Sequence, residues 1–239
     1  MIIFPILIKL IDAKNNLSIQ VHPDDEYAKR VEHEFGKTEI WYVLDADDDA
    51  QLIYGFKNKI SKEDFRKAIE NNTLPEVLNS VKVQKGDLFF IEAGTVHAIG
   101  KGTLIAEIQQ NSNSTYRVYD YGRLGKDGKP RELHIDKAVD VTVTEPPKYG
   151  TKPQGETENI TGGKKQLLTK CDLFTVYRYD CESEIKLTAD NSSFNHILII
   201  DGSGTINSRE FRKGDSFFIP ADFGEYTIKG NAEIILTKI

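Results

Sequence analysis

The segment Lys85 to Ala93 reads KGDLFFIEA, and Lys213 to Ala221 reads KGDSFFIPA, so the two match at seven of nine positions, 128 residues apart. Each copy carries a glycine turn followed by an apolar strand pattern. The first copy continues to His97, whereas the second has Glu225 at the corresponding offset. This pattern predicts a duplicated β-barrel with a metal-binding side chain in only one of its two versions.

The totals exclude several classes of protein. The chain has 239 residues and a formal charge of −6, so it offers no basic face for nucleic acid. Its longest apolar run, Ile2 to Ile11, is interrupted by Pro5 and Lys9 and is too short to span a membrane. Cys171 and Cys181 are the only cysteines, and their spacing is not that of a redox pair. We therefore expect a cytoplasmic protein with reduced thiols that binds neither nucleic acid nor membrane.

A comparison of the two copies also predicts where the first is interrupted. Trp41 to Asp45 aligns with Ile197 to Asp201 at an offset of 156, whereas the glycine turns align at 128. The difference of 28 residues is about the size of a helical segment at 61–80, where Ser61 can cap a helix and Pro75 can open a second one. We expect this segment to be an insertion in the first barrel.

The remaining pattern is mainly β. Short strands separated by turn residues follow one another through both halves, which favours two jelly-roll β-barrels. One exception is a helix opening at the acids after Pro23 and ending near Gly36, and another is a short helix within Leu133 to Val141. We expect a metal-binding domain at 1–145, a linker rich in proline and glycine at 146–164, and a second domain at 165–239.

Four side chains in the first half have metal-ligand chemistry. Gln20 and His22 alternate on one expected strand, so they point to one face, and Glu39 precedes another strand. With His97 they form a Gln, His, Glu, His set, which suits zinc or another divalent first-row metal. A single strand histidine such as His97 is more often a structural residue, so the argument depends on the whole set.

The other histidines and the second half lack this combination. We interpret His33, His134 and His196 as mainly structural or exposed. Asn195 occupies the position equivalent to Glu39, and Glu225 that of His97. The second barrel is therefore expected to be free of metal.

Two levels of resemblance follow from these residues. Gly86, Glu92, Gly94 and His97 are spaced as in the second motif of the cupin superfamily, with Glu92 where proline is usual. Four segments, listed in chain order, together resemble the type I mannose-6-phosphate isomerase family in its short Gram-positive form: FPILIKLIDAKNNLSIQVHPDD, GKTEIWYVLD, EAGTVHAIGKG and QQNSNSTYRVYDYGR. The resemblance covers essentially the whole chain and implies a bicupin fold.

The resemblance also implies roles for individual residues. The family's zinc ligands fall on Gln20, His22, Glu39 and His97, with one zinc ion per chain. Its active-site arginine falls on Arg117, and the lysine two residues before the glutamate ligand falls on Lys37. From the residues alone, Arg117 could equally be a strand arginine pairing with Asp120, and Lys37 an ordinary surface lysine.

The implied activity is the reversible conversion of D-mannose 6-phosphate to D-fructose 6-phosphate through an enediol. Arg117 could place a positive charge against the enediolate or the phosphate, and Lys37 could act as an acid or base. Two departures from the family bear on activity: Asn113 replaces an aspartate, and a segment that precedes the first strand in the family is missing, which would open a sheet edge.

Two alternatives remain open at this stage. One is a truncated, non-catalytic bicupin that binds metal and a sugar phosphate. The other is a different cupin enzyme, such as a metal-dependent oxygenase, against which the TYRVYDYGR segment argues. The expected partner is a small sugar phosphate, and the residues do not indicate an oligomeric state.

Overall fold

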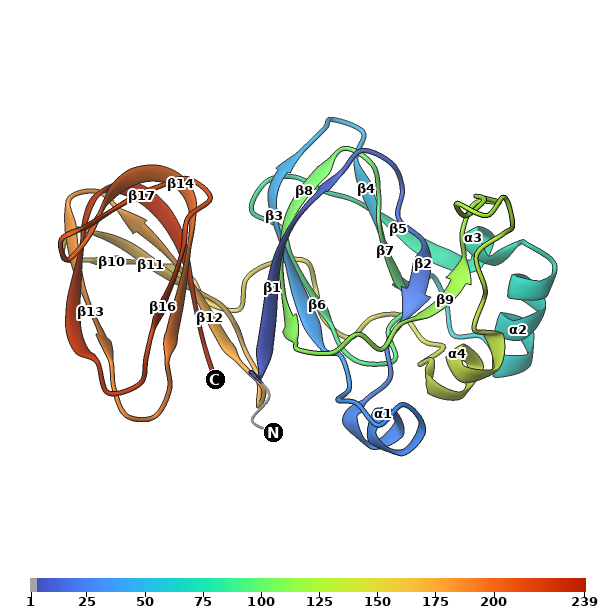
Figure 1. The fold of residues 1–239 in the computed structure, drawn as a ribbon. Helices are drawn as coiled ribbons and strands as arrows, with labels where there is room; N and C mark the ends of the chain where they lie inside the picture. Colours follow the sequence, from blue (N-terminus) through green and yellow to red (C-terminus); the bar gives the residue numbers. More distant parts are fainter. Residues whose placement is uncertain (1–3) are drawn as a thin grey trace. The chain divides into compact units, whose positions relative to one another are not determined.

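The computed structural model describes residues 4–239, and the chain divides into two compact units, residues 1–151 and 152–239 (Figure 1). We refer to them as unit one and unit two. Of the apolar run Ile2 to Ile11, Ile2 and Ile3 lie outside the described residues, and a strand begins within it at Ile6.

Unit one is built around antiparallel sheets. One sheet has the strand order β1-β8-β3-β6 and another has β5-β4-β7-β2-β9, which confirms the mainly β fold predicted from the sequence. The strands are β1 (Ile6–Ala13), β2 (Ile19–Val21), β3 (Glu39–Ala46), β4 (Gln51–Phe56), β5 (Leu78–Lys82), β6 (Leu88–Ile91), β7 (His97–Ile99), β8 (Thr103–Gln110) and β9 (Tyr116–Tyr119).

Helix α1 (Asp25–Val31) follows β2 and begins where the sequence indicates. The Asp24 side chain accepts a hydrogen bond from the Tyr27 backbone N–H, which caps the helix. Its end was predicted wrongly, because the helix stops at Val31 and not near Gly36. Gly36 has a different role: a Cβ there would lie 2.4 Å from the Asp24 backbone, so only glycine permits the chain to pass this close.

The expected helical segment contains α2 (Lys62–Glu70), capped by Ser61, and α3 (Leu74–Val77). It ends earlier than expected, because residues 78–80 already belong to strand β5. A later helix, α4 (Ile135–Val141), lies within the range predicted for it and contacts α2. Phe65 of α2 is fully buried in an apolar cluster that also contains Ile19 and Val118 of the barrel strands, so the helical segment packs against the barrel.

Unit two continues the β pattern. Its main sheet path is β10-β11-β12-β17-β14-β15, with β13 paired to β17 and β16 paired to β14. The strands are β10 (Thr157–Ile160), β11 (Gly163–Lys170), β12 (Thr175–Cys181), β13 (Glu184–Ala189), β14 (Asn195–Ile206), β15 (Arg209–Arg212), β16 (Ser216–Ile219) and β17 (Gly224–Lys238). The segment 146–164, expected as a linker, therefore includes β10 and the start of β11. Gly162 makes that hairpin possible, because a Cβ there would lie 1.8 Å from the Glu184 carbonyl oxygen.

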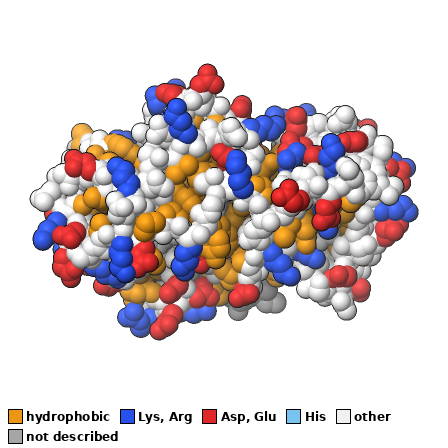
Figure 2. Space-filling model, turned by 180° about the vertical axis from the view of Figure 1, so that it is seen from behind, with side chains coloured by type: hydrophobic (Ala, Val, Ile, Leu, Met, Phe, Trp, Pro, Cys, Tyr) orange, Lys and Arg blue, Asp and Glu red, His pale blue; other side chains and the backbone are white. Residues whose placement is uncertain are grey.

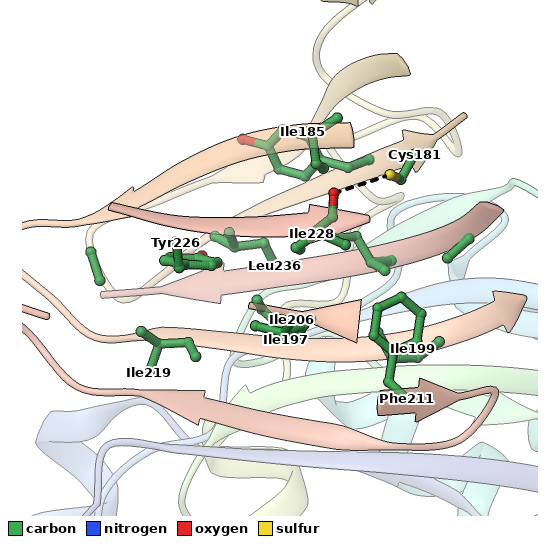
Figure 3. Close-up of a cluster of buried hydrophobic side chains, with 14 residues drawn as sticks. Cys181, Ile185, Ile197, Ile199, Ile206, Phe211, Ile219, Tyr226, Ile228 and Leu236 are labelled. Atoms are coloured by element: carbon green, nitrogen blue, oxygen red, sulfur yellow. Dashed lines mark hydrogen bonds between the residues drawn. The ribbon is translucent and has the colours of Figure 1, made fainter. Parts of the chain in front are cut away.

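The centre of unit two is apolar (Figure 3). Ile197 and Ile199 of β14 point inward beside Ile228 and Leu236 of β17, and all four are buried. The Cys181 thiol donates to the Ile228 carbonyl oxygen across 3.6 Å. Aliphatic side chains that are fully removed from water contribute about 1.5–3 kcal/mol each, so this cluster is the main source of stability in unit two.

The strand registers reproduce the repeat found in the sequence. In unit one Glu39 of β3 pairs with Ile91 of β6, and in unit two Asn195 of β14 pairs with Ile219 of β16. These pairs are related by the offsets of 156 and 128 that the sequence gives. The two units thus pair equivalent positions, although Glu39 in unit one is replaced by Asn195 in unit two.

The surface matches the composition. On the face drawn in Figure 2, basic and acidic side chains are interspersed and form no large region of one sign. Within residues 4–239, no helix has both the length and the apolar character needed to cross a membrane.

Candidate metal centre

The four expected ligand residues come together inside unit one from three strands. Gln20 on β2 is the direct register partner of His97 on β7, and His22 continues from the end of β2. Glu39 begins β3 in the other sheet. Sequence alternation on β2 therefore points Gln20 and His22 toward His97, which is 77 and 75 positions away along the chain, respectively.

The donor atoms lie close to one another. His22 Nε2 is 3.1 Å from His97 Nε2, and Glu39 Oε2 and Oε1 lie 3.6 and 3.5 Å from the His22 and His97 Nε2 atoms, respectively. The side-chain amide nitrogen of Gln20, Nε2, lies 3.4 Å from His97 Nε2 and carries the hydrogens of that contact. Both histidines and Glu39 are buried, and their donor atoms form a cluster within 4.8 Å.

These separations fit a shared divalent cation. Ligands that each lie about 2.0–2.2 Å from a tetrahedral ion are about 3.3–3.6 Å apart, close to the spacings observed here. Among residues 4–239, neither oxygen of Glu39 has a hydrogen-bond partner although the side chain is fully buried. Buried polar atoms normally have hydrogen-bond partners, so a buried carboxylate that only faces Lys37 Nζ and the two imidazoles, across 3.2–3.6 Å, has the surroundings of a cation ligand.

Neighbouring groups orient His97. Its Nδ1 lies 2.8 Å from the carbonyl oxygen of Thr95, which can only accept, so Nδ1 carries the proton and Nε2 presents its lone pair to the cluster. The ring of Trp41 approaches His97 edge-on, with centroids 5.2 Å apart. The ring is thereby held from two sides.

The electrostatics of the cluster favour the protonation states that bind metal. Burial, followed by the charge of His22, lowers the pKa of His97 to about 3, and burial lowers the pKa of His22. Burial alone would raise the pKa of Glu39, but the charges of Lys37 and His22 outweigh it and lower that pKa. At neutral pH the site therefore presents neutral imidazoles and an ionised carboxylate, as metal coordination requires.

Lys37 is part of the same buried site. Its Nζ lies 3.2 Å from Glu39 Oε2, and only 5% of the residue is exposed. The backbone N–H of Lys37 donates to the carbonyl oxygen of Pro23, which fixes the segment that carries it. The surface-lysine alternative raised by the sequence is thus wrong for this residue.

Arg117 lies on β9, directly opposite Gln20. Its guanidinium donates to the Glu132 carbonyl oxygen across 3.0 Å, and within the described part of the chain its Nε has no hydrogen-bond partner. The pairing with Asp120 that the sequence left open is made instead by Arg123 and Arg131, both of which donate to that carboxylate. Arg117 is accordingly free to direct part of its charge elsewhere.

Sequence reasoning missed two further charged side chains. Lys9 of β1 donates to Glu107 Oε1 of β8 across 2.7 Å, and Trp41 Nε1 donates to Glu107 Oε2 across 3.1 Å. Burial, and then the charge of Glu39, raise the pKa of Glu107. Lys9 and Glu107 each interrupt an apolar strand pattern in the sequence. Because charged residues inside buried strands are rare unless paired, this interruption could have indicated that they pair.

The remaining histidines lie elsewhere. His33 is exposed, with a left-handed φ of 58°. His134 accepts a hydrogen bond from the Arg117 backbone, and His196 Nε2 lies 2.7 Å from the Ser216 hydroxyl in unit two. In unit two Asn195 donates to the Tyr226 hydroxyl, and Glu225 is an exposed partner of Lys186. That the second barrel binds no metal stays a prediction.

The fold and the site together define a class. Repeated barrels of antiparallel strands, with a buried His, Glu, His cluster in the first, are features of a bicupin with a metal-binding cluster in one barrel. Two family models match: "Phosphomannose isomerase type I, catalytic domain" over residues 2–52 and "Mannose-6-phosphate isomerase, cupin domain" over residues 164–239.

Relatives extend the match to nearly the whole chain. The probable mannose-6-phosphate isomerase GmuF of Bacillus subtilis (strain 168) is 41% identical, over 98% of this chain and 75% of the relative. Mannose-6-phosphate isomerase ManA of the same organism is 42% identical over 99% and 75%. The crystal structure of mannose 6-phosphate isomerase from Bacillus subtilis superposes with a TM-score of 0.91 at 39% identity, covering 99% of this chain and 76% of that chain. The chain belongs to the type I mannose-6-phosphate isomerase family.

Proposed function

We propose that this protein is a zinc-dependent aldose–ketose isomerase that interconverts D-mannose 6-phosphate and D-fructose 6-phosphate through an enediol. The observation that carries the proposal is the convergence of His22, Glu39 and His97, whose donor atoms lie within 4.8 Å of one another in a buried site. The proposed substrate comes from the family, because curated relatives that are 42% and 38% identical to this chain are named mannose-6-phosphate isomerases.

Gln20, His22, Glu39 and His97 are the residues that would hold the ion. Two imidazoles, one carboxylate and one amide suit zinc and the neighbouring divalent metals, and no thiolate is among them. A bound divalent cation would polarise the sugar's carbonyl and hydroxyl oxygens and so stabilise the negative charge that develops during isomerisation.

Lys37 is the group we assign to proton transfer. The reaction removes a proton from C2 of the aldose and returns one to C1, so it needs a base and an acid close to those carbons. Lys37 Nζ lies 3.2 Å from Glu39 and is buried, which brings its ammonium next to the ligand cluster. The short distance from Lys37 Nζ to Glu39 Oε2 favours Lys37 for proton transfer over groups that lie farther from the ligand cluster.

Arg117 supplies a fixed positive charge. It pairs in register with Gln20, so its side chain extends from the same face of the sheet as a ligand residue. A guanidinium with an unpartnered Nε suits an enediolate or phosphate oxygen, because it forms charge-assisted hydrogen bonds to anions.

A coupled assay that follows fructose 6-phosphate formation tests the proposal. The zinc-loaded protein should turn over D-mannose 6-phosphate, and removal of the metal by a chelator should abolish turnover, with recovery on adding zinc. A pure, metal-loaded preparation without turnover would overturn the enzyme claim. If calorimetry then detected sugar-phosphate binding, the non-catalytic bicupin would be favoured instead.

The location and partners form part of the same proposal. The expected partner is the sugar phosphate itself, with no nucleic acid or membrane. Cys171 and Cys181 are both free thiols, as is usual for proteins of the reducing cytoplasm, where we place this enzyme.

A further inference from the structure

Two buried carboxylates on neighbouring strands have opposite hydrogen-bond environments. Glu39 on β3 and Glu107 on β8 are 0% and 3% exposed. Both oxygens of Glu107 accept hydrogen bonds, one from Lys9 Nζ at 2.7 Å and one from Trp41 Nε1 at 3.1 Å. By contrast, the Glu39 carboxylate makes no hydrogen bond within residues 4–239: its Oε2 forms an ion pair with Lys37 Nζ at 3.2 Å, and its oxygens face His22 and His97 of the ligand cluster.

The strand register explains how close these carboxylates are. Trp41 is the direct partner of Glu107, and Glu39 is the partner of Gln109, so the two glutamates are diagonal neighbours on one face. Glu107 is nonetheless not a member of the described cluster of donor atoms, which consists of His22, Glu39 and His97. Something must therefore keep a second nearby carboxylate away from the metal position.

Trp41 has the contacts needed to do this. It is fully buried, and its indole N–H is the donor to Glu107 Oε2. Its ring also contacts His97 edge-on at 5.2 Å and packs with the apolar cluster that includes Phe89 and Ile105. The indole thus forms the boundary between the polar half of the barrel interior and the apolar half, and its N–H points to the polar side.

We propose that Trp41 is a positioning residue: its N–H, together with the ammonium of Lys9, holds the Glu107 carboxylate outside the metal's ligand set and so keeps one coordination position open to substrate. The inference rests on the metal site of the proposed function. Catalytic metal sites differ from structural ones in having such an open position. An unrestrained carboxylate next to a divalent cation would occupy it.

Cobalt substitution tests the inference without relying on activity. Visible absorption of bound Co²⁺ is strong at four-coordinate sites and weakens as the coordination number rises. Trp41→Phe keeps an aromatic ring against His97 but removes the N–H that restrains Glu107. Because the Glu107 carboxylate would replace the water in the open position, we expect a shifted band and slower removal of Co²⁺ by a chelator than in the unmodified protein.

Two further variants separate this effect from general damage. Tyr54→Phe is the matched control, because it removes one buried donor, to the Phe90 carbonyl oxygen at 2.9 Å, within the same apolar cluster but away from Glu107. It should leave the cobalt band unchanged. Trp41→Phe combined with Glu107→Leu should restore the original band, since this side chain has no oxygen that could enter the ligand set.

The outcomes are distinct. A Trp41→Phe protein with the cobalt band and chelator kinetics of the unmodified protein would overturn the inference. So would a changed band that the added Glu107→Leu substitution fails to restore. If Trp41→Phe does not fold, Lys9→Met removes the other donor to Glu107 and should shift the band in the same way. An unmodified protein that binds no Co²⁺ would instead refute the proposed metal site itself.

Discussion

Removal of the metal should lower the thermal stability of unit one by a large amount. The ligands join β2 and β7 of one sheet to β3 of the other, so unfolding either sheet releases the ion. With free zinc at about 1,000 times its dissociation constant, binding stabilises the folded state by about 4 kcal/mol. For a unit of this size each kcal/mol shifts Tm by about 2–4 °C, so chelation should lower Tm by about 8–16 °C.

Differential scanning calorimetry of zinc-loaded and chelator-treated protein measures this shift. His97→Ala should already have the lower Tm and should not respond to chelator. His196→Ala is the matched control, because this histidine lies in unit two beside Ser216, and it should keep the full response. A shift below about 2 °C, in protein whose metal content is confirmed before and after chelation, would refute the reasoning.

Three further predictions concern proton transfer, acid stability and packing. Lys37→Met should retain one metal ion per chain, measured by elemental analysis, while isomerase turnover falls by about 100-fold or more, because the buried ammonium is lost from the site; loss of the metal as well would contradict the role assigned to it. Burial would raise the pKa of Asp120, but hydrogen bonds from Arg131 and Arg123 outweigh it and lower that pKa. A carboxyl with a lowered folded pKa contributes stability above its unfolded pKa of about 3.9 and loses it as the pH falls through the folded value. Asp120→Asn should therefore be about 1–3 kcal/mol less stable at pH 7 by denaturant titration, and the difference should vanish on acidification; a difference that persists at about pH 2 would argue against this ion pair. Ile199→Ala, in the buried cluster of unit two, should cost about 2–5 kcal/mol and leave metal content unchanged, and a measured loss of metal would mean that the two units are coupled.

Much of the architecture could be read from the sequence because the repeat preserves strand register. The offsets of 156 and 128 correspond to the pairs Glu39 with Ile91 and Asn195 with Ile219. The helix after β2 could be located from Asp24, whose side chain caps it. The end of this helix could not be located from the sequence. Gly36 is present because the chain passes close to the Asp24 backbone, and the residue with left-handed φ after the helix is His33.

Residues of the metal centre could be predicted from the sequence only where they belong to a local sequence pattern. Gln20 and His22 alternate on one strand, and His97 follows a recognisable turn, so these residues could be proposed together. The Lys9–Glu107 pair joins side chains 98 residues apart; Lys9 lies in the first quoted segment but shows no ligand spacing there, and Glu107 lies in none of the quoted segments. Only the strand pairing of β1 with β8 brings them together, and Trp41 enters the site for the same reason, through its pairing with Glu107.

Titration of metal-stripped protein with zinc, while fructose 6-phosphate formation from D-mannose 6-phosphate is followed, is the most direct test of a metal-dependent isomerase. Turnover should be absent at the start, rise in proportion to the added zinc and level off at one equivalent per chain, and His97→Ala should give none at the same zinc concentrations. Full turnover by the stripped protein, or a normal titration of His97→Ala, would contradict the central claim.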